Sequence, residues 1–439
     1  MNDSGRATLP RPNEIIDTSN MTIGQWVVIL LCTLAMAMDG YDVMSIALAA
    51  ASLKAEWGLT KAQLGLILPL EFLGMAIGAI FMGSLSDLLG RKKILLICLV
   101  IVSVGMALSA FATNMLYMGS SRVFTGIGIG GILATVTAFA SEYSNNKNRA
   151  LAVILVAGGY TLGIFFAGKL GGHLLETSGW RAIFKYGAMI SVVSIPFILF
   201  LVPDSVALLE QKKTEAARSK ISKILARYGK STDFTMVENI AETEKVSPKT
   251  LFKGKVGRIT AIMTLFYLGQ IFTYYFFVKW MPPEVVELGY SQKQSGDILS
   301  TVSLWGLFGS FVMAGLSRFI PLKNLMIVSL VGAGLSVACF PFFTSSFEMM
   351  SLVGGIAGFW LFAVISGAFG MFAISFPKQM LASGSGLVLG LGRGGAITGP
   401  WAAGLLFASG MTLSTVSPIM AMGSFVAAVA LFFLPKDKV

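Results

Sequence analysis

The sequence contains few charged residues, one histidine and three cysteines, and each of these low counts excludes some classes of protein function. Only 13% of its 439 residues are charged, 55% are hydrophobic, and the mean hydropathy is +0.77. This is too apolar for a soluble domain and too long for one membrane span. The single histidine, His173, excludes multi-histidine metal chemistry. The three cysteines fall in different apolar segments without metal-ligand spacing, so we expect no metal and no cofactor.

What the sequence does contain is a succession of apolar segments of roughly 20 residues, the length that a helix needs to cross a bilayer. Twelve such segments alternate with charged or turn-forming breaks, and they predict an all-α polytopic membrane protein with twelve transmembrane helices. The expected spans are 22–48, 62–83, 93–112, 115–141, 150–175, 182–202, 256–281, 293–316, 324–343, 348–373, 384–409 and 412–434.

One long polar stretch divides the twelve spans into two groups of six. It predicts an N-terminal half over residues 1–203, a central loop over 204–254 and a C-terminal half over 255–439. The loop contains an amphipathic pattern near 216–228 that indicates a helix. The fifth and eleventh spans carry glycines at matching positions, as expected of a transporter built from two parallel repeats.

The distribution of lysine and arginine predicts the orientation in the membrane. If both termini are cytoplasmic, most of the 33 Lys and Arg residues lie in cytoplasmic segments, which agrees with the positive-inside rule. The outer segments then hold Lys54, Lys61, Arg181, Lys185, Lys279 and Lys293. Attraction to anionic lipid accounts for the net charge of +11 without a nucleic-acid partner. We therefore expect a protein integral to the plasma membrane, the inner membrane of a bacterium, with the lipid bilayer as its surroundings.

Carboxylates inside the apolar segments are the first candidates for function. Asp39 and Asp42 lie in the first span within an otherwise uncharged stretch, and their i, i+3 spacing places both on one helix face. Glu71 adds a third carboxylate in the second span. Such groups are costly in hydrocarbon unless they pair, protonate or line a water-filled cavity, so they indicate transport. Arg122, in the fourth span, lies within reach of Asp42, as a pair that separates to take up a proton or as a static bridge.

Arg393 is the candidate for binding an anionic substrate. It lies near the middle of the eleventh span, and its planar guanidinium fork matches a carboxylate. No acidic residue occurs between Glu348 and Asp437, so its partner must come from the other half, from backbone carbonyls or from a substrate. Side chains that could complete the site, each with ordinary packing as its alternative, are Tyr41, Tyr267, Gln270, Tyr274, Trp305, Phe359 and Trp360.

A charged loop follows the second span, where residues 83–93 read GSLSDLLGRKK. Asp87 lies about one turn before three cations, where it can cap the next helix or form a charge bridge to a neighbouring bundle. Glu142, at the end of the fourth span, is expected to pair with this loop. We predict that Asp87, Arg91 and Glu142 form a gate at the cytoplasmic mouth.

These segments together resemble a known family. The loop at 83–93 resembles the signature loop of the major facilitator superfamily. With it, DGYD at 39–42, RVFTGIGIGG at 122–131, GWRAIF at 179–184 and GLGRGGAITGP at 390–400 resemble the aromatic acid:proton symporter family, which includes 4-hydroxybenzoate and benzoate transporters. Two features depart from that pattern, namely Glu71 and an arginine, Arg318, in the second-half copy of the loop.

The resemblance implies the major facilitator fold, with two pseudo-symmetric six-helix bundles, and proton-coupled import of a small aromatic carboxylate by alternating access. Within transport, the alternatives are a sugar, an aliphatic dicarboxylate, or a drug exported by proton antiport. An integral-membrane enzyme should show clustered catalytic groups, and a receptor should show a folded extramembrane domain. The sequence favours neither, so we predict a carrier without catalytic residues, acting as a monomer.

Overall fold

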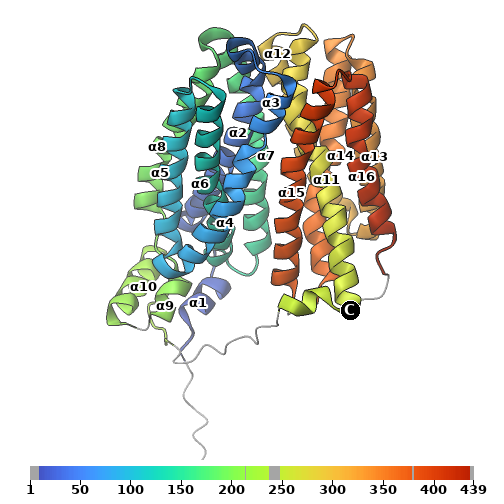
Figure 1. Cartoon of the computed structure of the whole chain (residues 1–439). Coiled ribbons are helices and arrows are strands. Elements are labelled where there is room, and N and C mark those ends of the chain that lie inside the picture. Colours follow the sequence, from blue (N-terminus) through green and yellow to red (C-terminus); the bar gives the residue numbers. More distant parts are fainter. Residues whose placement is uncertain (1–8, 213, 237–247, 378–379, 436–439) are drawn as a thin grey trace, which may run out of the picture.

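The computed structural model describes residues 9–212, 214–236, 248–377 and 380–435, and every regular element in these ranges is a helix (Figure 1). The long helices are α2 (Ile23–Trp57), α4 (Leu70–Leu89), α5 (Arg91–Ala110), α6 (Met115–Glu142), α7 (Arg149–Ser178), α8 (Trp180–Leu201), α11 (Gly254–Glu287), α12 (Gln292–Leu316), α13 (Leu322–Cys339), α14 (Phe347–Ser375), α15 (Leu381–Ala408) and α16 (Leu413–Phe432). The short ones are α1 (Pro12–Thr18), α3 (Lys61–Ile67), α9 (Val206–Gln211), α10 (Glu215–Arg227), η1 (Pro248–Phe252) and η2 (Phe340–Phe343).

The predicted set of twelve membrane helices is confirmed. In the described part of the chain, eleven helical segments are long and apolar enough to cross a bilayer, with α3 and α4 counted together. The twelfth is α15, which has 28 residues but a lower mean hydropathy because it carries many glycines and Arg393. The amphipathic helix predicted in the central loop is α10, whose inner face buries Ala217, Ile221 and Leu225.

Two spans of the first group differ from the prediction. Helix α2 continues to Trp57 and ends at Gly58, which adopts a left-handed conformation with φ of 63°. Asp42 therefore lies near the middle of this helix, whereas the predicted span 22–48 would have placed it nearer the end. The second span is broken between α3 and α4 at Pro69, because proline has no backbone N–H to continue the helical hydrogen bonds.

The two groups of six helices repeat one packing pattern. In the first group α2 packs on α7, α4 on α6, and α5 on α8, while in the second α11 packs on α15, α12 on α14, and α13 on α16. These pairs correspond when the helices are counted in order within each group. The groups lie side by side in Figure 1, with the first in blue and green and the second in yellow to red.

The two groups contact each other mainly at the end where α3 lies, which we call the α3 end. There α7 packs against α12, α3 against α15, and α2 against α11. Ion pairs join the groups at the same end, namely Lys54–Glu287 at 2.5 Å, Lys61–Glu284 at 2.7 Å, Lys61–Glu287 at 2.8 Å and Lys169–Asp297 at 2.5 Å. Glycines allow the backbones to approach closely here, because a Cβ on Gly65 would clash with the Cα of Gly404. The α3 end is therefore closed.

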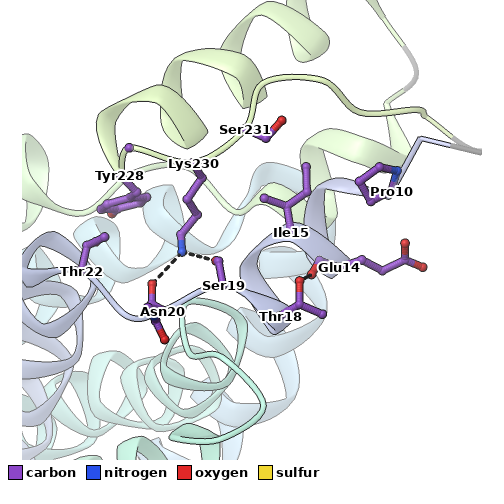
Figure 2. Close-up of a pocket in the computed structure, with 11 residues that line it drawn as sticks. Pro10, Glu14, Ile15, Thr18, Ser19, Asn20, Thr22, Tyr228, Lys230 and Ser231 are labelled. Carbon is purple, nitrogen blue, oxygen red and sulfur yellow. Dashed lines mark hydrogen bonds between the residues drawn. The ribbon is translucent and has the colours of Figure 1, made fainter.

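Helices α1, α9 and α10 lie at the opposite end, below the first group in Figure 1. Glu210 of α9 accepts hydrogen bonds from Arg11 and Asn13, and Arg149 pairs with Asp17 of α1. These contacts link α9 to the N-terminal segment and dock that segment onto the first group, while η1, at the other end of the loop, packs against α11 of the second group. A surface pocket of about 720 Å³ opens between α1 and the end of α10, where Lys230 donates to Ser19 and Asn20 (Figure 2). This pocket holds none of the side chains predicted for transport.

Candidate functional site

A chain of buried charges crosses the middle of the first group. Arg122 on α6 binds Asp42 on α2 with both ends of its fork, Nη1 to Oδ1 at 2.9 Å and Nη2 to Oδ2 at 2.6 Å. Its Nη2 also donates to Oε2 of Glu71 on α4 at 2.5 Å. All three residues are fully buried. The structure thus brings together three of the four residues predicted for proton coupling, and one cation holds two carboxylates.

Lys279 on α11 supplies the second cation of this cluster. It is fully buried, and its Nζ donates to Oε1 of Glu71 and to the backbone carbonyl of Val43. Lys279 was predicted to lie in an outer segment, and this prediction is wrong because the residue is buried within α11. Helix α11 continues for eight residues beyond it, through Pro282 and Pro283, to Glu287. The signal that could have revealed its role is the unpaired excess of carboxylates in the first two spans.

Asp39 lies one turn before Asp42 on the same face of α2 and is 2% exposed. Its Oδ1 is buried and has no hydrogen-bond partner in the described structure. The charges that act on it are Asp42, Glu71, Lys279 and Arg393. Leaving a buried carboxylate oxygen unpaired costs free energy, so Asp39 is a member of the cluster with an unsatisfied oxygen.

Arg393 faces the first group from α15 and is partly exposed. Its Nη1 donates to the backbone carbonyl of Met75 on α4 at 2.9 Å, so one of the three partners expected from the sequence is present. Within the described residues this is the one hydrogen bond recorded for the guanidinium, which has five N–H groups. Most of its donors therefore remain available to an anion.

Tyrosines lie between Arg393 and Asp39. Tyr267 packs against Gly392 of α15, next to Arg393, and Tyr274 and Tyr275 follow two turns further along α11, with ring centroids 4.8 Å apart. Tyr275 reaches across to Tyr160 of α7, with the two hydroxyls 3.4 Å apart. The hydroxyl of Tyr274 is buried without a hydrogen-bond partner in the described structure. Two predicted residues, Tyr267 and Tyr274, thus belong to this region, and the sequence analysis did not select Tyr160.

Other predicted substrate-binding residues lie elsewhere or are already bonded. Tyr41 donates to the carbonyl of Ile183, and Gln270 bonds Leu361 and Ser424, so both tie helices together within one group. Trp305 lies against Gly355, Phe359 packs on Phe308, and Trp360 covers Gly332. These last three contacts join α12, α13 and α14. The depth of a residue within a span, which a sequence can suggest, does not determine which face of the helix the residue occupies.

Of the predicted gate, Arg91 and Glu142 form an ion pair at 2.8 Å. Glu142 also accepts hydrogen bonds from the hydroxyl of Ser205 and the backbone N–H of Ala207. All these residues belong to the first group or to the loop docked on it, so the pair does not join the two groups. The side chain of Asp87 lies outside the described part of the structure. Gly90, between them, has a φ of 102°, which explains the glycine of the loop sequence.

Among the described residues, no group of three or more His, Cys, Asp or Glu side chains could hold a metal ion. The site consists of charged side chains and tyrosines. Its carboxylates lie in the first group of helices, and its cations come from both groups, Arg122 from the first and Lys279 and Arg393 from the second. A buried ionic cluster shared by two similarly packed six-helix groups defines a membrane transporter.

The chain belongs to the Major Facilitator Superfamily, whose family model matches residues 30–318. It is 28% identical to a gallate transporter of Pseudomonas putida over 95% of this chain and 93% of that protein. It is 28% identical to a benzoate transport protein of Acinetobacter baylyi, over 90% and 86% respectively. A 4-hydroxybenzoate transporter of Pseudomonas aeruginosa is 26% identical, over 92% of this chain and 91% of its own.

Solved structures show the same fold. The inward-open xylose transporter XylE of E. coli matches with a TM-score of 0.73 at 17% identity, covering 94% of this chain and 97% of the other. A bacterial homologue of the lysosomal transporter Spinster, in an inward-facing conformation, matches with a TM-score of 0.69 at 16% identity, covering 94% and 95%. The prediction of a major facilitator fold, and of a transporter rather than an enzyme, is confirmed.

Proposed function

We propose that this transporter imports a small aromatic carboxylate together with protons by alternating access. The observation that carries the proposal is Arg393, a partly exposed cation in the middle of α15 with most of its donors unused by the protein. Tyr267, which is partly exposed, offers aromatic surface beside it, and the hydroxyl of Tyr274 two turns further along α11 has no hydrogen-bond partner in the described structure; both features suit a substituted aromatic ring. The names of the three relatives, which specify gallate, benzoate and 4-hydroxybenzoate, support the same substrate class.

Proton coupling follows from the balance of charges in the cluster. Asp42 and Glu71 share Arg122, and Asp39 lies beside them with an unpartnered oxygen. A carboxylate held by a cation stays ionised, and it can take up a proton when that cation moves away. In this proposal Asp39, Asp42, Glu71 and Arg122 couple transport to the proton: the three carboxylates are the groups that can accept it, and Arg122 controls their ionisation. Movement of the two halves changes which carboxylates remain paired.

The proposal includes the orientation. With both termini in the cytoplasm, the α3 end faces outward, and the basic loop with α9 and α10 lies against the inner leaflet of the bacterial inner membrane. The functional unit is the monomer, because the proposed site is built within one chain. The halves correspond to residues 1–203 and 255–439, with 204–254 as the cytoplasmic loop.

Uptake into proteoliposomes tests the proposal. The full chain is reconstituted, an alkaline interior is imposed, and accumulation of labelled benzoate, 4-hydroxybenzoate and gallate is compared with that of succinate and xylose. We expect accumulation of at least one aromatic carboxylate, abolished by a protonophore. Accumulation of succinate or xylose instead would show that the substrate belongs to another class. If the aromatic carboxylate only reaches equal concentrations on both sides, whatever the pH gradient, transport is not coupled to protons.

Arg393 is tested separately. A charge-assisted hydrogen bond contributes roughly 1.5–3 kcal/mol, so Arg393→Ala should weaken binding by about tenfold to more than a hundredfold. Arg393→Lys keeps the charge but loses the fork, so its loss should be smaller. The amide analogue of the best substrate should bind the wild type weakly yet lose little more with the alanine variant. If the losses of affinity from the amide analogue and from Arg393→Ala add together, the substrate carboxylate binds elsewhere, and Lys169 is the next cation to examine.

A further inference from the structure

We propose that Lys279 and Glu71 form an ionic latch between the two halves, and that one proton together with one carboxylate releases it. Lys279 belongs to the second group, but both acceptors of its ammonium group, Glu71 and the carbonyl of Val43, belong to the first. Its Nζ also lies 5.1 Å from the ring centre of Phe72. The latch is thus a contact between halves and not a bond within one.

The position of Lys279 links the latch to closure of the α3 end. It lies eight residues before Glu287, the residue at the end of α11 that pairs with Lys54 and Lys61. At 1.5 Å per residue this is about 12 Å along the helix, in the same contact between α11 and α2. Opening of the α3 end withdraws this part of α11 from the first group. Lys279 then loses Glu71.

The charges determine what can compensate for that loss. While the latch is closed, Lys279 and Arg122 balance Asp42 and Glu71, and all four are fully buried. Removing one partner from a buried ion pair is strongly unfavourable. Once Lys279 withdraws, the paired charges left in the first group are Asp42, Glu71 and Arg122, an excess of one negative charge that one proton neutralises. Asp39 makes no ion pair within the described residues while the latch is closed, so the withdrawal breaks no ion pair of Asp39. The ammonium group left on α11 requires one anion, and a monocarboxylate supplies it.

The groups that face Glu71 from the neighbouring helices support this assignment. Arg122 approaches from α6 and Lys279 from α11, while Asp42 and Asp39 lie on α2, and Arg393 approaches α4 from α15. Arg122 stays with Asp42 on the same half, so its pair survives the opening. Lys279 is the cation that must leave. It is therefore a positioning residue for the conformational change, separate from the proposed binding role of Arg393.

Cross-linking at the α3 end measures the latch without any transport. Ser52 on α2 and Gln292 on α12 are hydrogen-bonded across the halves, with Nε2 2.8 Å from Oγ. Cysteines at these two positions, in a background in which Cys32, Cys98 and Cys339 are replaced by serine, report the closed state through their rate of reaction with a short thiol cross-linker. The full chain is used in proteoliposomes.

We expect Lys279→Gln and Glu71→Gln each to lower the cross-linking rate by about tenfold or more, because a latch of buried charges opens when either member is neutralised. The double variant should be no more open than either single variant, since the same interaction is lost. Lys185→Gln, an exposed lysine on α8, is the matched control and should react like the wild type. Additive effects, or wild-type cross-linking in Lys279→Gln, would overturn the proposal.

Two further arms keep the test decisive. If Lys279→Gln fails to insert into the membrane, the double variant is used in its place, because the double variant leaves neither charge unpaired. Wild-type cross-linking in the double variant would equally refute the latch. Acidification should lower cross-linking in the wild type and have a smaller effect in Glu71→Gln; equal responses would assign the pH dependence to other groups and refute release by protonation of the latch. Only the carboxylate arm, in which 4-hydroxybenzoate at acid pH lowers cross-linking further, rests on the proposed function. If only this arm fails, the result contradicts 4-hydroxybenzoate as the substrate but not the Lys279–Glu71 latch.

Discussion

Gly296 on α12 provides a direct test of how the α3 end closes. A Cβ added there would lie 2.3 Å from the backbone oxygen of Gly168 and 2.9 Å from the Cα of Gly172, both on α7 of the other half. These are backbone atoms of a helix and cannot rotate away as a side chain can. Gly296→Ala is therefore incompatible with the closed α3 end as it stands, although nothing in its own half opposes it at these distances.

The size of the effect follows from the overlap. Extra atoms forced into a packed interface cost about 1–3 kcal/mol, and the same free energy applied to a two-state equilibrium changes it by about 5- to 150-fold. The substitution removes the overlap when the halves separate, so the cost applies to the closed α3 end only. We expect Gly296→Ala to favour the state with this end open by a factor in that range.

The same helix supplies two controls. At Gly309 a Cβ would lie 2.2 Å from the carbonyl oxygen of Phe359 on α14, within one half, and at Gly315 it would meet nothing within 4 Å. Gly309→Ala should lower the thermal stability of the protein in detergent, and Gly315→Ala should change neither property. Cross-linking between cysteines at positions 52 and 292 measures closure. Wild-type cross-linking in Gly296→Ala would refute the proposed contact, and a loss shared by all three variants would refute its specificity.

The remaining predictions concern the charged cluster and the docked loop. Asp42→Asn and Asp39→Asn should each abolish accumulation driven by a pH gradient, with at least one of them still exchanging substrate, as counterflow would measure; wild-type accumulation in both would make the carboxylates structural. Glu142→Gln should weaken the charged contacts to Arg91 and Ser205, each typically about 1.5–3 kcal/mol, and so speed cleavage of the central loop by trypsin. Unchanged cleavage would show that Glu142 does not hold the loop.

Hydrophobic length was sufficient to predict the twelve helices, because a bilayer imposes nearly the same requirement on each span. It failed at the ends of α2 and α11, both of which continue beyond their predicted spans, and in α11 the added residues up to Val285 are buried in the protein. Helix α11 continues through Pro282 and Pro283, and Ser295 of α12 donates to the carbonyl of Pro282 at 2.9 Å. Two adjacent prolines are expected to end a helix. Only the packing of α12 against α11 reveals that they lie inside one.

The pairing of Asp42 with Arg122 could be anticipated because each lies deep within a span and an isolated charge there requires a partner. The positions of the aromatic side chains could not, because a residue's depth leaves its helix face open. Tyr267 and Trp305 illustrate this: one lies beside Arg393 and the other packs against α14. Helix rotation depends on contacts with neighbouring helices, and these contacts are tertiary.

The sequence alone offers no reason for a third carboxylate at Glu71. Its ion pair with Lys279, a residue predicted to lie in an outer segment, supplies that reason. One residue adds a negative charge to the first half, and the other adds a positive charge to the second. Each would be costly alone in the membrane, and together they are neutral only while the halves touch. Their charges therefore make the neutrality of the site depend on conformation. A proton and a carboxylate are the two ligands whose charges restore that neutrality when the halves separate, and this is the physical basis on which we connect the cluster to symport.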